Sequence, residues 1–157
     1  MANKIRLLPY NWTLKDYYDF VTAFRVGNTV ETFSLALKLI VSWDYKTPLT
    51  SKNPIMKLGV AESAEVIRTV METIGTYMED LSIEDVEVDF SSWDTERFML
   101  FDDMRRTGKF DKSEKMAREI VKWDSIPEGD EPFTFTVAAT VYKAITEAYK
   151  QIVSGKN

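Results

Sequence analysis

The sequence predicts an all-α fold in which two tandem, related three-helix units pack as a pseudo-twofold helical domain. In six segments of the 157-residue chain, apolar residues recur at three- and four-residue steps, the spacing of one helix face. Glycines or prolines separate most of these segments, as is typical of helix ends. The order of helix, Gly turn, helix, Pro loop and long helix occurs twice, which indicates an internal repeat.

The first predicted unit covers residues 1–81. Its first helix begins after Thr13, which can cap the helix N-terminus because an acid stands three residues later, and it ends before Gly27. The second helix is expected over about 29–43 and the third over about 61–81, with a loop that contains two prolines between them.

The acidic segment 82–92 is expected to be an extended linker. Its acids alternate with apolar residues as in a short strand, but a single strand has no evident partner there. The second predicted unit, 93–157, has a fourth helix that Gly108 ends, a fifth over about 111–123 and a last one over about 136–153.

Residue identities repeat along with the pattern. The matched pairs are Trp12 with Trp93, Phe20 with Phe101, Arg25 with Arg106, Gly27 with Gly108 and, after a one-residue gap, Lys38 with Arg118, Ile40 with Ile120, Val41 with Val121, Trp43 with Trp123 and Asp44 with Asp124. Amphipathic periodicity alone does not specify such identities, so duplication of an ancestral unit is favoured over convergence of two helical hairpins.

Each repeated residue has an expected structural role. The glycines would be left-handed helix caps, and the tryptophans that close the second helices would reach a loop carbonyl with the indole N–H. The aspartates after them would accept bonds from loop amides. The arginines would bond helix-end carbonyls or pair with those aspartates. A ligand pocket around each Arg and Asp is the less favoured alternative.

Composition restricts the chemistry open to this chain. It has no Cys and no His, which excludes disulfides, thiolate nucleophiles and the commonest general base and transition-metal ligand. Adjacent acids such as Asp102 and Asp103 do not face each other on a helix. No phosphate-binding or catalytic motif is present. We therefore expect a non-enzymatic protein with no catalytic residue, no cofactor and no metal site.

Charge and hydropathy indicate where the protein acts. The 20 basic and 25 acidic residues give a net charge of −5, which disfavours a nucleic-acid partner. No apolar segment is long enough to cross a membrane, and no secretory signal begins the chain. We expect a cytoplasmic protein that binds neither nucleic acid nor membrane.

The first predicted helix is crowded with aromatic residues. Tyr17 and Tyr18 are adjacent and cannot both point into a core, so one should face solvent or a partner. The charge around these aromatics is mixed, which favours a core or a protein contact over base stacking. The candidate partner-binding residues are Tyr17, Tyr18, Phe20 and Phe24.

An aromatic helix, a Gly turn, a helix that ends in Trp-Asp and a Pro loop with a further helix together form a distinct unit. It is carried by Phe20, Arg25, Gly27, Ile40, Val41, Trp43, Asp44 and the loop 46–54, and it returns over 101–124. This unit resembles the tail assembly chaperones of long-tailed bacteriophages. The resemblance implies a non-catalytic factor in the host cytoplasm that binds tape measure protein and tail-tube subunits, buries a client's helical stripe in a groove, and could form a homo-oligomer.

Two other functions stay open. An acidic inhibitor or adaptor would dock the segment 79–89 on a basic partner protein, and salt would weaken that binding. A small-molecule-binding or enzymatic helical domain would need an enclosed pocket with convergent polar groups.

Overall fold

The computed structural model describes residues 5–155, and the chain divides into two compact units, Met1–Asp80 and Leu81–Asn157. Within the described residues there are six α-helices, and every strand has two to four residues. The all-α fold class predicted from the sequence is therefore confirmed.

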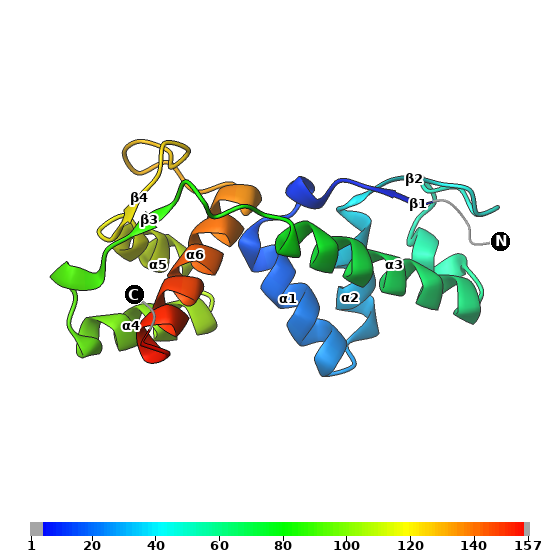
Figure 1. The fold of residues 1–157 in the computed structure, drawn as a ribbon. Helices are drawn as coiled ribbons and strands as arrows, with labels where there is room; N and C mark the ends of the chain where they lie inside the picture. Colours follow the sequence, from blue (N-terminus) through cyan, green and yellow to red (C-terminus); the bar gives the residue numbers. More distant parts are fainter. Residues whose placement is uncertain (1–4, 156–157) are drawn as a thin grey trace. The chain divides into compact units, whose positions relative to one another are not determined.

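The first unit combines three α-helices with one antiparallel two-stranded sheet (Figure 1). Its elements are β1 (Ile5–Leu7), η1 (Pro9–Asn11), α1 (Leu14–Arg25), α2 (Thr29–Leu37), β2 (Ile40–Trp43), η2 (Pro54–Lys57) and α3 (Val60–Glu79). Helix α3 packs against α2, β1 and both short 3-10 helices. The core residues include Trp12, Phe20, Leu35, Leu39, Ile55, Val66, Val70 and Ile74.

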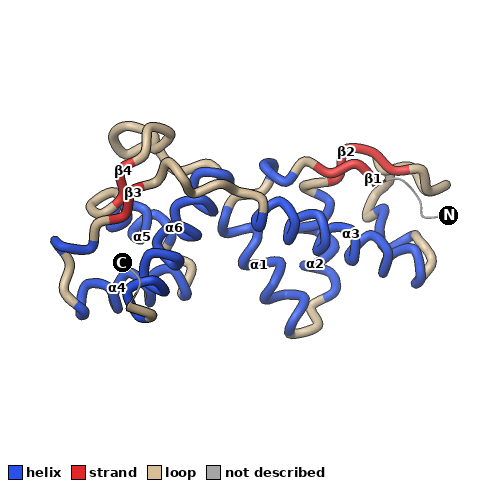
Figure 2. Tube along the Cα trace, viewed as in Figure 1, coloured by secondary structure: helices blue, strands red, loops and turns tan. Residues whose placement is uncertain are grey.

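The second unit has the same order of strand, 3-10 turn, two helices, strand and long helix, but its described residues include no counterpart of η2. Its elements are β3 (Glu87–Val88), η3 (Phe90–Ser92), α4 (Thr95–Arg106), α5 (Phe110–Ala117), β4 (Val121–Lys122) and α6 (Phe135–Val153). Strands β3 and β4 are antiparallel (Figure 2). The core residues include Phe101, Met116, Ile120, Phe135, Val141, Tyr142 and Ile145.

The two short sheets correct three sequence predictions. The second and fifth helices end at Leu37 and Ala117, and the β-branched residues that follow them enter β2 and β4. The segment 82–92, expected to be an extended linker without a strand partner, does have one, because β3 pairs with β4 and the Asp89 N–H donates to the Ile120 carbonyl at 2.8 Å. The strand partner was missed because two helices separate it from β3 in the chain.

Helix ends follow the predicted capping chemistry. The Asp16 N–H donates to Thr13 Oγ1 at 3.1 Å, and the Thr13 N–H donates to the Asp16 carboxylate at 3.0 Å, which completes a capping box. Gly27 and Gly108 have φ values of 77° and 79°, in the left-handed region. Both predicted glycine caps are therefore confirmed.

Equivalent ring pairs occur in the two units. The rings of Trp12 and Phe20 lie 5.1 Å apart at 46°, and those of Trp93 and Phe101 lie 5.4 Å apart at 49°. In each unit the Trp follows a 3-10 turn and packs on the helix after it. An ancestral duplication would account for this correspondence and stays a prediction.

The one-residue difference between the units lies at a β-bulge. Arg6 pairs with Ser42 and Leu7 with Ile40, so Val41 is the extra residue of β2. The β3–β4 pairing has no such irregularity. The backbone thus places the gap at Val41, and not before position 38 as the match of identities predicted. Ile40 then corresponds to Val121, while the match of Trp43 with Trp123 is kept.

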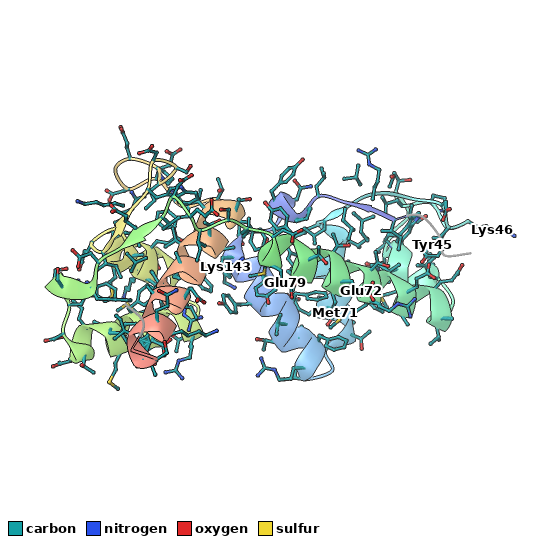
Figure 3. The ribbon with its side chains drawn as sticks, viewed as in Figure 1. Tyr45, Lys46, Met71, Glu72, Glu79 and Lys143 are labelled. Atoms are coloured by element: carbon teal, nitrogen blue, oxygen red, sulfur yellow. The ribbon has the colours of Figure 1, made fainter. Side chains whose placement is uncertain are left out.

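The loop after β2 is held by its aromatic residues. Trp43 Nε1 donates to the Thr47 carbonyl at 2.8 Å, as predicted, although Trp43 ends a strand and not a helix. Tyr45 is buried against the Trp43 ring, with centroids 5.3 Å apart, and its hydroxyl donates to the Glu65 carboxylate of α3. Figure 3 shows Tyr45 beside α3 and Lys46 extending away from the ribbon.

The repeated charged residues do not take the predicted roles. Arg106 pairs with Asp102 one turn earlier on α4, with Nε 3.1 Å from Oδ2, and not with Asp124. Across residues 5–155, Arg25 forms no ion pair, and neither Asp44 nor Asp124 accepts a bond from a loop amide. All of these groups except Asp102 are exposed, so water solvates their charges.

Candidate protein-binding groove

The four predicted partner-binding residues do not form one surface. Phe20 is 4% exposed and packs against Trp12, so it belongs to the core and its prediction as a contact residue is wrong. Tyr17 and Tyr18 are half-buried, with their rings 5.3 Å apart, and burial raises the pKa of the Tyr17 hydroxyl. Phe24 is exposed at the end of α1. Of the four, Phe24 alone is exposed, at 50%.

An aromatic groove lies in the second unit, where η3 and the first turn of α4 meet the last turns of α6. It encloses about 180 Å³ and is lined by Phe90, Trp93, Asp94, Thr95, Phe98, Tyr149 and Ile152. Ile152 and Tyr149 are exposed, and the rings of Phe90, Trp93 and Phe98 are half-buried. This aromatic groove is an apolar concavity open to solvent.

Ring contacts fix the walls of the aromatic groove. The Phe98 ring stacks on Tyr149 with centroids 4.5 Å apart and planes 11° apart. Phe98 also meets Phe90 edge-on, at 5.7 Å and 77°. Such pairs add about 0.5–1.5 kcal/mol each beyond the burial of area. These ring contacts therefore hold residues from η3, α4 and α6 together.

Trp93 is oriented by a charged pair. Its Nε1 donates to Glu119 Oε1 at 2.9 Å, and Arg97 donates to both oxygens of the same carboxylate, at 2.9 and 2.5 Å. The hydrogen bond from Arg97 is the main reason that the pKa of Glu119 lies below its usual value. The equivalent Trp12 is 2% exposed and donates to the Leu35 carbonyl inside the core. The same residue type thus serves the core in one unit and the groove in the other.

The polar rim of the aromatic groove is already engaged in the fold. Asp94 caps α4 by accepting a bond from the Arg97 N–H at 2.8 Å. The volume of the groove is below the ~300–1,000 Å³ typical of small-molecule sites. Its dimensions suit a few side chains of a protein partner better than an enclosed ligand.

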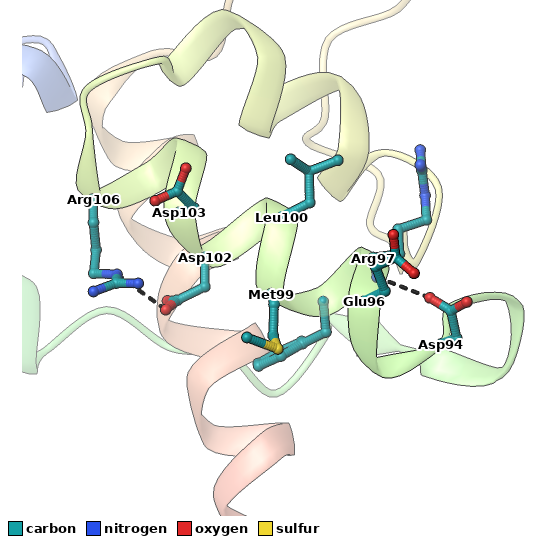
Figure 4. A pocket seen from close by; sticks show the side chains of 9 residues that line it. Asp94, Glu96, Arg97, Met99, Leu100, Asp102, Asp103 and Arg106 are labelled. Atoms are coloured by element: carbon teal, nitrogen blue, oxygen red, sulfur yellow. Dashed lines mark hydrogen bonds and ion pairs between the residues drawn. The ribbon is translucent and has the colours of Figure 1, made fainter.

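A larger depression, of about 710 Å³, runs along the outer face of α4 (Figure 4). Its lining residues all come from Asp94–Arg106, so a single helix bounds it and it is open surface. Asp102 accepts bonds there from Arg105 and Arg106, at 2.7 and 3.1 Å. Asp102 therefore takes part in helix-surface ion pairs, and because the adjacent Asp103 does not face it on the helix, the two acids do not suggest acid–base chemistry.

Three polar side chains of the second unit make hydrogen bonds that support its packing. Ser113 is buried and shares a hydrogen bond with the Tyr142 hydroxyl inside the second core. Burial raises the pKa of Glu114, which accepts a bond from the Phe133 N–H at 2.9 Å. Residues 5–155 bring no group of three acidic side chains together in a way that could hold a metal ion.

Sequence reasoning did not identify Tyr149 or Ile152 as residues of this groove. The sequence did contain a sign of this surface, because the apolar stripe of α6 continues beyond Ile145, the last buried residue of the helix. A stripe longer than the core that it faces leaves its end uncovered. Trp93 was singled out by its repeat, but its exposure was not predicted.

Comparison with protein-family models, with curated proteins and with solved structures finds no match for this chain. Among the described helices, none combines the length and the hydropathy needed to span a bilayer.

Proposed function

We propose that this chain is a non-catalytic protein-binding factor that takes an apolar helical segment of its partner into the aromatic groove. The observation that carries the proposal is the open cluster formed by Phe90, Trp93, Phe98, Tyr149 and Ile152. Contiguous apolar surface that stays hydrated in the free protein is a feature of protein interaction sites.

Recognition would follow the helix-in-groove mode. A partner helix presents apolar residues at positions i, i+3, i+4 and i+7, and these replace water over the rings. Aromatic residues often dominate such contacts, at about 2 kcal/mol or more for each anchor. Because Glu119 and Arg97 already orient the Trp93 indole, little side-chain entropy is lost when a partner binds.

The more specific form of the proposal is a phage tail assembly chaperone. It rests on the resemblance of the two Phe-to-Trp-Asp motifs, 20–44 and 101–124, to that family. The client would then be a tape measure protein, whose long apolar helices would be shielded in the host cytoplasm while tail-tube subunits are recruited.

The test is a pull-down with tagged protein from the cells that naturally express it, followed by mass spectrometry. Ile152→Asp places a charge in the aromatic groove, whereas Val153→Asp changes the neighbouring exposed residue, which does not line the groove. A long, helix-rich client should be retained by the wild type and by Val153→Asp and lost by Ile152→Asp. Equal retention by both variants would contradict the proposed groove.

An acidic adaptor is the second candidate, favoured by one observation. Residues 69–96 contain nine acids and no Lys or Arg, and Glu84, Asp85 and Glu87 are exposed. In the same pull-down this function predicts a basic partner that moderate salt releases and that Ile152→Asp retains.

A further inference from the structure

A second apolar groove lies in the first unit, between α2 and η2. This α2 groove encloses about 160 Å³ and is lined by Val30, Phe33, Ser34, Leu37, Asn53, Ile55 and Met56. Met56 is 56% exposed and Val30 is exposed beside it, while Phe33 and Leu37 are half-buried. The volume suits one or two side chains and is too small for a typical ligand.

The α2 groove has a basic edge. One wall of the groove is formed by residues of the segment 53–56. Lys52 and Lys57 directly precede and follow this segment in the sequence, and both are exposed. Between Glu31 and Glu62 the sequence has four lysines and a single acid. No ion pair within residues 5–155 involves Lys52 or Lys57, so both charges are available to a partner.

The outer face of α4 has the complementary chemistry. Glu96, Met99, Leu100 and Asp103 stand at i, i+3, i+4 and i+7, which places them on one helix stripe opposite the buried Phe101. Met99 is 64% exposed, and Leu100 and both acids are also exposed. Figure 4 shows these side chains extending from the helix. An apolar pair with one acid at each end is thus presented on a rigid element.

We infer that the α4 stripe of one copy docks in the α2 groove of a second copy. Met99 and Leu100 fill the apolar floor, and Glu96 and Asp103 face Lys52 and Lys57. Seven residues of helix separate the two acids by about 10 Å, so they flank the apolar pair as the lysines flank the 53–56 edge. Charge complementarity selects a second copy, because unpaired acids border the stripe and unpaired lysines border the groove.

Docking of this kind is heterologous. The stripe and the groove are different surfaces of the same chain, so each copy keeps one unused partner surface after pairing, and association continues into a ring or an open chain of copies. The contact does not use the aromatic groove, so it is independent of the proposed function.

The experiment measures mass by sedimentation velocity over a wide range of protein concentration, at low and high salt. Met56→Asp disables the groove, Met99→Asp disables the stripe, and Val60→Asp adds the same charge at an exposed residue outside both surfaces. Circular dichroism checks that each variant is folded. We expect wild type and Val60→Asp to self-associate with a salt-sensitive constant, and each groove or stripe variant to lose about tenfold or more.

Mixing the two disabled variants gives the decisive result. Met56→Asp retains a working stripe and Met99→Asp retains a working groove, so together they should form a dimer that stops at two copies. Lys57→Glu alone should likewise weaken association. Mixing the Lys57→Glu protein with the Asp103→Lys protein should restore association, because the two reversed charges then face each other.

Two results would overturn the inference. The first is a wild type that is monomeric at every concentration, which would assign the stripe to a foreign protein. The second is a mixture of Met56→Asp and Met99→Asp that forms no dimer. Ile152→Asp, the variant that tests client binding, should self-associate like the wild type, so that a failure of either proposal is seen separately.

Discussion

Trp12 and Trp93 are matched residues of the two units, and alanine substitution should affect mainly stability at Trp12 and mainly partner binding at Trp93. Full burial of an aromatic side chain covers about 150–250 Å² and is worth about 4–6 kcal/mol at ~25 cal/mol per Å². Buried Trp→Ala changes cost about 3–5 kcal/mol, and loss of the bond to the Leu35 carbonyl adds about 1 kcal/mol. We therefore expect Trp12→Ala to lower the free energy of unfolding of the first unit by about 4–6 kcal/mol.

The Trp93 side chain is half-buried, and its indole N–H bonds to an exposed carboxylate that water can replace. Trp93 is less deeply buried than Trp12, so Trp93→Ala should lose less transfer free energy than Trp12→Ala. Small domains have about 5–15 kcal/mol of stability in total, and a unit of this size lies at the low end. Trp12→Ala should therefore leave the first unit largely unfolded, whereas Trp93→Ala should stay folded and lose its partner.

The assay is urea unfolding followed by circular dichroism, with partner retention measured in parallel. Trp12→Phe is the control, since it keeps most of the apolar area and removes the indole N–H. The reasoning fails if Trp93→Ala costs as much stability as Trp12→Ala, or if Trp93→Ala binds its partner as tightly as the wild type does.

Three further predictions follow from local geometry. Gly27→Ala and Gly108→Ala should each lower the free energy of unfolding by about 1–2 kcal/mol, because φ is positive at both positions. Gly75→Ala inside α3 should instead raise it by up to about 1 kcal/mol. Thermal unfolding of the three variants checks the signs of these changes. Tyr142→Phe should cost about 1 kcal/mol in urea unfolding, because Ser113 keeps its bond to the Phe110 carbonyl; a loss above about 3 kcal/mol would contradict this account. The pKa of Glu119 is lowered by its bond from Arg97, so the stability from this pair is present above the ordinary glutamate pKa and is lost as pH falls through the lower folded value. Trp93 fluorescence should respond in that acidic window, and in Glu119→Gln the response should be absent.

The helices were predictable because their signals are local. Apolar spacing, the Thr13–Asp16 capping box and the glycines at 27 and 108 act within a few residues, and the structure has each of them. The strands were not predictable in the same way. β3 has two residues, and its partner is defined by backbone bonds to a segment beyond two helices, which no side-chain pattern encodes.

The candidate site was harder to predict because exposure depends on what other elements cover. Phe20 and Phe24 share one face of α1, yet Phe20 is buried under Trp12 and Phe24 lies past the end of the core. Periodicity assigns both to the same stripe. In the same way, the apolar stripe of α6 does not show at which residue the core stops covering it, so the exposure of Ile152 was not predicted.

The bulge at Val41 shows how the two units can differ in length within a strand while the residue before the bulge stays buried. Ile40 and Val121 are both buried, and the extra residue is absorbed immediately after Ile40. Because β2 can lose or gain a residue at Val41, it separates the tightly packed end of α2 from the loop before α3, whose length can vary. Deletion of Val41 should therefore be tolerated far better than deletion of a residue one turn earlier in α2. Insertions that lengthen the loop before α3 should also be tolerated best at Val41.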